Sequence, residues 1–189
     1  MQESHTLLNK LVETLSQSSD PFKMQNARLS ALPREIKEIR NPEPRCELTQ
    51  GIWLDFQEGA GVETVVGPAE ARDGVRLLLK ERGDSAYYSF SYDIPPEPLR
   101  EARYLGQLLR CSSAGPARFQ VCLRYILADG FRDVFARDVV VLTGEAQEDL
   151  VFLRIDADLA QQAVGAEVLF FFDGRSFDVT LQAIEALLV

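Results

Sequence analysis

The side chains that carry most enzymatic chemistry are few in this chain of 189 residues. It has one histidine, His5, so neither a cluster of metal-binding histidines nor a serine or cysteine nucleophile paired with histidine is expected in the body of the chain. Two carboxylates alone can hydrolyse a glycosidic bond, but among 29 acidic residues a suitably spaced pair arises by chance. Phosphate-loop, dinucleotide-binding and zinc-protease motifs are absent from the sequence. We therefore expect a protein that is not an enzyme.

The chain carries a net charge of −9 at pH 7, from 20 basic and 29 acidic side chains. An acidic protein is repelled by phosphate groups, so neither nucleic acid nor an anionic membrane is expected as the main partner. The acidity lies beyond residue 45, because residues 1–45 hold 7 basic and 6 acidic side chains. The two parts of the chain thus differ in charge as well as in pattern.

Three cysteines, Cys46, Cys111 and Cys122, form neither a CxxC pair nor a disulfide-rich pattern, which predicts reduced and mostly buried thiols. The first residues interleave charged and polar side chains with leucines, so the basic and apolar regions of a signal peptide are missing. No stretch approaches the roughly 20 apolar residues that a membrane helix needs. These features predict a cytoplasmic location.

Residues 1–45 have the pattern of a helical arm followed by a linker. An apolar stripe at spacings of three and four consists of Leu7, Leu8, Leu11, Val12 and Leu15. Asp20 followed by Pro21 predicts an N-cap and first helical position for a second helix, which Pro33 limits. Residues 33–45 predict a short helix that runs into an extended linker. The arm is expected either to pack on the following domain or to form a homo-oligomer through residues 4–40.

From Cys46 onward the apolar period is two, which is typical of strands. The expected strands are 48–56, 62–66, 74–81, 86–94, 102–111, 118–127, 132–142, 149–155, 167–173 and 177–187. Turn residues predict hairpins at 83–84, 113–116, 129–130 and 173–174. Residues 168–172 are apolar on both faces, so their strand is expected to be central in its sheet.

About ten strands without intervening helices need a second layer to cover their apolar faces. The pattern therefore predicts a mainly β protein, in which residues 46–189 form an antiparallel two-sheet sandwich of the jelly-roll kind. Residues 1–45 form a short α-helical arm in front of it.

The succession of segments from about Trp53 onward resembles the galactose-binding-like and carbohydrate-binding-module jelly rolls. The segments are GVRLLLKERGDSAYYSFSYDIP, ARYLGQLLRCSSAG, ARFQVCLRYILADG, VVVLTGEAQEDLVFLRID and AEVLFFFDGRSFDVTLQAIEAL. This resemblance implies non-catalytic binding of a glycan. It also implies a structural calcium ion near the first and last strands, for which Asp178 and Glu47 are the matching carboxylates; the alternative for both is a solvated surface acid.

Glycans are held by aromatic rings that stack on sugar faces and by planar polar groups that bind hydroxyls. Side chains of these types are expected to face outward on neighbouring strands: Trp53, Tyr87, Gln107, Gln120 and Arg124. This set assumes that strands 102–111 and 118–127 are neighbours. The alternative is a structural or protein-interaction module that assembles through the arm, in which the same sheet face is only hydrated and Trp53 belongs to the core.

Overall fold

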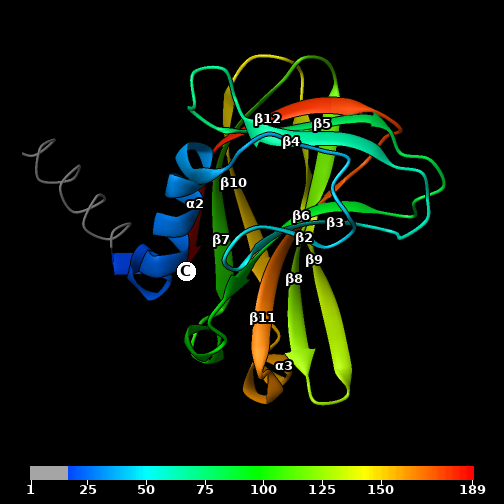
Figure 1. Cartoon of the computed structure of the whole chain (residues 1–189). Helices are drawn as coiled ribbons and strands as arrows, with labels where there is room; N and C mark the ends of the chain where they lie inside the picture. Colours follow the sequence, from blue (N-terminus) through cyan, green and yellow to red (C-terminus); the bar gives the residue numbers. More distant parts are fainter. Residues whose placement is uncertain (1–16) are drawn as a thin grey trace, which may run out of the picture.

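Two antiparallel six-stranded sheets pack face to face in the computed structural model, which describes residues 17–189 (Figure 1). The strands of sheet A are, in spatial order, β1 (Ile39–Arg40), β4 (Glu63–Pro68), β5 (Val75–Glu81), β12 (Phe177–Leu188), β7 (Tyr104–Ser113) and β10 (Gln147–Arg154). Those of sheet B are β2 (Cys46–Thr49), β3 (Ile52–Phe56), β6 (Tyr88–Ile94), β11 (Gly165–Phe172), β8 (Ala117–Leu127) and β9 (Gly130–Leu142). The mainly β, two-sheet prediction is confirmed.

The expected strands from residue 48 onward are found, but one of them is divided into two. The stretch expected as one strand over 48–56 is the hairpin β2–β3, because Gly51, at a φ of +74°, reverses the chain. The short helix α3 (Ala157–Gln162) was not expected. Its N-cap is Asp156, whose Oδ1 accepts hydrogen bonds from the amides of Asp158 and Leu159.

The connections between strands differ from the prediction. Of the four turns predicted to close hairpins, only the one at Asp129–Gly130 does so, between β8 and β9. The other three turns join β5 to β6, β7 to β8 and β11 to β12, and each of these pairs is divided between the two sheets. Gly, Asp and Pro favour chain reversal whether the chain returns to its own sheet or crosses to the other. The expected pairing of strands 102–111 and 118–127 is therefore wrong.

The core lies between the sheets and contains the inward side chains of every long strand. Aromatic rings make up much of sheet B's contribution: Phe90 and Phe170 stack at 6.0 Å between ring centroids, and Phe119 lies 5.0 Å from Phe172. Strand β11 lies between β6 and β8, so the prediction of a central strand is confirmed. The thiols are free, and two of the three, Cys111 and Cys122, are buried as expected.

Helix α2 (Lys23–Glu35) follows a 3-10 turn at Asp20–Phe22 and packs against β12 beside the open edge of the sandwich (Figure 1). The N-cap of that turn is Ser19, one residue earlier than expected. The side chain of Asn26 forms two hydrogen bonds with the backbone of Ala186, of 3.0 and 2.9 Å. Pro33 lies within the last turn of α2, which ends at Glu35.

The described part of the arm therefore packs on its own sandwich. Phe22, Leu29 and Leu32 belong to the same hydrophobic cluster as the two sheets. The short helix expected after Pro33 is wrong, because Ile39 and Arg40 form β1 and pair with β4. His5 and the stripe over residues 7–15 lie outside the described residues. Among residues 17–189, no helix is long and apolar enough to cross a membrane.

Candidate functional site

The outward side chains of sheet B form a face on which short and long side chains lie in rows across the strands. We call it the sheet B face. Its central row runs through Trp53, Ser91, Leu169, Cys122 and Phe135, which are opposite one another in β3, β6, β11, β8 and β9. The three middle members are at most 3% exposed although they point away from the core. Short side chains therefore lie between two exposed or half-exposed aromatic rings.

The row next to the central one, on one side, places Phe171 between Ser89 and Gln120. Phe171 is near the middle of the face, with its ring 6.5 Å from that of Tyr87 and 5.7 Å from that of Phe135. The Tyr87 hydroxyl donates a 3.4 Å hydrogen bond to Asp55 Oδ2. Burial, followed by the negative charge of Asp55, raises the pKa of Tyr87, so the phenol is neutral and remains a donor at neutral pH.

A charged row borders the central row on the other side. Glu167 is 5% exposed, and its Oε1 accepts a 3.1 Å hydrogen bond from Arg45. Arg124 is opposite Glu167 in β8 and forms two 2.8 Å bonds with the carboxylate of Asp133. The hydrogen bonds that Arg124 donates to Asp133 raise the pKa of Arg124, so this guanidinium stays charged. The row thus holds its planar groups in fixed orientations.

Aromatic rings also support both guanidinium groups. Arg124 lies 4.0 Å above the centroid of the Phe131 ring, and Arg45 lies 5.5 Å from that of Trp53. Arg45 has a φ of +52°, which is uncommon for a residue with a side chain. Its amide donates a 2.9 Å bond to Asp55 Oδ1. These contacts hold the segment before β2 so that Arg45 reaches over the sheet B face.

Four of the five expected ligand residues lie on this face. Trp53 and Tyr87 are half-buried at its margin, and Arg124 is in the charged row. Gln120 is opposite Phe171, and its Nε2 donates a 2.8 Å bond to the backbone oxygen of Ala136 at the irregularity between β8 and β9. The outward position expected for Gln107 is wrong. It is in β7 of sheet A, fully buried, and bonded to the Tyr92 hydroxyl.

Sequence reasoning missed several members of the sheet B face: Arg45, Asp55, Phe135, Glu167 and Phe171. They come from segments far apart in the chain, and only the order of the strands brings them together. Period-two alternation gives the side of a strand on which each residue lies, but it does not give the neighbouring strand. The only local signal was the mixed polar and apolar outward positions in otherwise apolar strands.

The two expected calcium ligands do not fit a shared ion. Asp178 is in β12 of sheet A, where both carboxylate oxygens accept hydrogen bonds from Arg76, at 2.8 and 2.7 Å. Glu47 is in β2 of sheet B and accepts a bond from the amide of Gly51. Among residues 17–189, no group of three or more histidine, cysteine or acidic side chains is placed to hold a metal ion.

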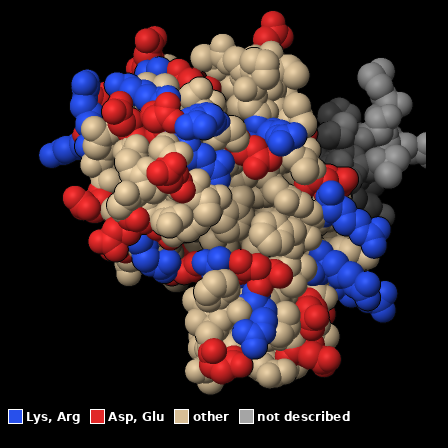
Figure 2. Space-filling view, turned by 90° about the vertical axis from the view of Figure 1, so that its right-hand side faces the viewer, with Lys and Arg blue, Asp and Glu red and all other residues tan. Residues whose placement is uncertain are grey.

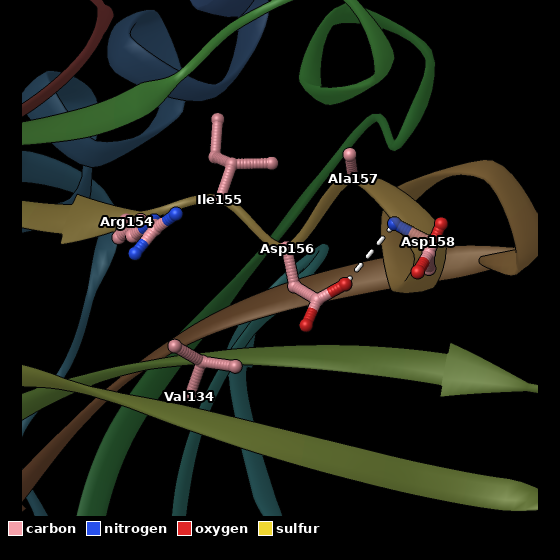
Figure 3. A pocket seen from close by; sticks show the side chains of 6 residues that line it. All are labelled: Val134, Arg154, Ile155, Asp156, Ala157 and Asp158. Atoms are coloured by element: carbon pink, nitrogen blue, oxygen red, sulfur yellow. Dashed lines mark hydrogen bonds between the residues drawn. The ribbon is translucent and has the colours of Figure 1, made fainter.

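A hollow outside the sheet B face lies between β9 and the end of β10, with a volume of about 480 Å³ (Figure 3). Its lining includes Val134, Arg154 and the acids Asp156 and Asp158. The Asp156 carboxylate caps α3, and the Asp156 amide donates a hydrogen bond to the Tyr125 hydroxyl oxygen. Its acidic group is therefore part of the local structure of the helix start.

Around the strands β8 and β9, acidic and basic side chains are interspersed and surround an area of uncharged surface (Figure 2). No large region of a single charge is seen on this side of the molecule. This distribution agrees with the ion pairs on the sheet B face, in which each guanidinium has a carboxylate beside it.

No family model and no curated protein matches the sequence. Solved structures do match the fold. A CBM4 structure has a TM-score of 0.57 at 14% identity, over 85% of this chain and 99% of its own. A family 11 carbohydrate-binding module from Clostridium thermocellum, solved with a β-1,3-1,4-mixed-linked tetrasaccharide, has a TM-score of 0.52 at 14% identity, over 80% and 96%. The chain therefore has the jelly-roll sandwich fold of the carbohydrate-binding modules.

Proposed function

We propose that this protein is a non-catalytic module that binds a glycan on the sheet B face. The observation that carries the proposal is the arrangement of aromatic rings and oriented planar polar groups around the buried residues Ser91, Leu169 and Cys122 in the middle of the sheet B face. Rings such as Trp53 and Tyr87 offer the apolar surface on which sugars stack. Arg124 and Gln120 offer hydrogen-bond donors that are already oriented by Asp133 and by the β9 backbone.

The charges of the sheet B face favour an uncharged glycan. Arg45 is paired with Glu167 and Arg124 with Asp133, and Asp55 adds a further carboxylate. An acidic sugar would bring its carboxylate close to these acids, and both of these guanidinium groups already have a carboxylate partner. Hydroxyl groups, by contrast, both donate to carboxylates and accept from guanidinium groups.

The alternative of assembly through the arm has less support. Leu29 and Leu32 of α2 are already covered by the sandwich of the same chain, whereas Met24 is exposed. Within residues 17–189, the helix therefore leaves no apolar stripe that needs a second copy to cover it.

Calorimetric titration of the full chain with the β-1,3-1,4-mixed-linked tetrasaccharide, and then with a panel of other uncharged oligosaccharides, tests the proposal. We expect at least one Kd of about 1 mM or tighter. Trp53→Ala and Tyr87→Ala should each weaken it about tenfold. Tyr104→Ala removes a similarly exposed ring from sheet A and should leave the Kd unchanged. Failure of the whole panel to bind, or equal binding by all variants, would exclude the proposed site.

A further inference from the structure

Strand β10 is an edge of sheet A: among residues 17–189 it pairs with no strand other than β7, although β9 of sheet B runs close to it. Of the four edge strands, β1 has two residues, β2 has four with a register shift, and β9 pairs with β8 through a register shift. β10 has eight residues in unbroken register with β7, with neither Pro nor Gly. Edge strands of this kind pair with further strands unless a bulge, a proline or an inward charge prevents it.

The side chains on the outer side of β10 are also unusual for an edge. Leu150 is 47% exposed and Phe152 is 44% exposed. Glu148 and Arg154 lie on the same side of the strand, two residues before Leu150 and two residues after Phe152. Among residues 17–189 neither of these two charged groups forms an ion pair. An apolar pair is therefore bracketed by one unpaired acid and one unpaired base.

The directions of the amide and carbonyl groups of β10 determine which of its residues can pair along its free edge. The amide of Ile155, just after β10, donates to the backbone oxygen of Arg103, just before β7, and Tyr104 exchanges two 3.0 Å bonds with Val189 on the other side. Because amide and carbonyl directions alternate along a strand, the odd-numbered residues of β10 bond to β7. The even-numbered residues, from Glu148 to Arg154, therefore direct their amides and carbonyls to the free edge.

We propose that β10 pairs antiparallel with β10 of a second copy of this chain. Two-fold symmetry and the alternation require even-numbered residues to be opposite even-numbered residues. One such register places Glu148 opposite Arg154 of the second copy, and Leu150 opposite its Phe152. Every outward side chain of β10 then has a complementary partner, twice by symmetry. This match of charge and apolar surface favours a second copy over an unrelated strand.

Sedimentation velocity of the full chain, from about 1 µM to about 500 µM, tests the proposal. We expect a reversible dimer. Glu148→Arg alone and Arg154→Glu alone each place like charges together twice per dimer and should raise the Kd about tenfold. The double variant E148R/R154E restores both pairs and should return the Kd to near its original value. Glu63→Arg, at an exposed position of β4 on the far side of sheet A, is the matched control and should not change it.

Leu150→Pro provides an independent test. Proline at an even position removes a free-edge amide and leaves the bonds to β7 in place, so the chain should fold as a monomer. A chain that is monomeric throughout the concentration range would overturn the proposal. A dimer whose Kd is unchanged by each of the two single charge reversals would overturn it as well, because such a dimer uses another surface.

Discussion

The Tyr92 hydroxyl and the Gln107 side chain form a hydrogen bond across the core, between sheet B and sheet A. Both residues are buried, at 1% and 0% exposure. Gln107 also donates a 3.0 Å bond to the backbone oxygen of Gly106. A polar side chain that sequence reasoning assigned to the surface thus links the two layers from the inside.

We expect Tyr92→Phe and Gln107→Leu each to lower the free energy of unfolding by about 1–3 kcal/mol, because each leaves a buried polar partner unsatisfied. The double variant removes both polar groups and should lose less than the sum of the two. Urea unfolding of the four proteins measures this. Strict additivity would show that the two side chains do not depend on each other.

The side chain of Asn26 connects helix α2 to β12 through two hydrogen bonds with the backbone of Ala186. Asn26→Ala leaves the amide and carbonyl of Ala186 without these partners and should lower the free energy of unfolding by about 1–3 kcal/mol. Met24→Ala, at a position that is 65% exposed on the same helix, should change it by less than about 0.5 kcal/mol. Thermal unfolding compares the two, and equal effects would contradict the anchoring role of Asn26.

The three thiols should differ in reactivity. Burial raises the pKa of Cys111 and of Cys122 to about 12, and the negative charges of Asp149 and Asp133 add to the effect. Cys46 is only half-buried, with a smaller rise in its pKa from burial. A thiol reagent at pH 8 should therefore modify one cysteine per folded chain and three per unfolded chain. Rapid modification of Cys111 in the folded protein would contradict the described packing.

Stability should fall at high pH. Buried thiols, and the Tyr125 phenol with a pKa raised to about 12 by burial, keep their protons in the folded chain at pH values where the unfolded chain has lost them. The unfolded chain then binds fewer protons, so the free energy of unfolding decreases as pH rises. The decrease begins near pH 9 for the cysteines and continues to about pH 12. Unfolding midpoints in urea from pH 7 to pH 11 measure it, and a midpoint that stays constant would be the contrary result.

Removal of calcium should have no effect on folding. Asp178 is bonded to Arg76, and Glu47 lies in the other sheet. We expect the same thermal midpoint with excess EDTA and with added calcium, because an ion bound only to the folded chain would raise the midpoint as its concentration rises. A rise of several degrees with calcium would reveal a site other than this pair.

Alternation and turn chemistry predicted most of the fold. The outward and inward positions of Phe119 to Tyr125 follow directly from period two, and the central place of β11 follows from its apolar residues on both sides. Strand order is the part that local pattern does not determine. The turn at Ser113–Pro116 has the composition of a hairpin but crosses between sheets, and for that reason Gln107 was assigned to the wrong environment.

Because strand order could not be predicted, part of the candidate site was missed as well. Trp53, Tyr87 and Arg124 were predicted from residue type and parity, whereas their partners Glu167 and Asp55 come from strands that only the sheet order places beside them. The buried position of Glu167 is also unlike the usual location of glutamate on the surface. Its pairing with Arg45 depends on a contact between segments 122 residues apart.

The position of β12 has a consequence for how this chain acquires its structure. It is the last strand in the sequence, yet it lies between β5 and β7, so sheet A without it would be two separate pieces. During synthesis, the earlier strands of sheet A therefore cannot join until the residues of β12 leave the ribosome. Such non-local pairing slows folding and favours one cooperative transition once β12 is available to pair.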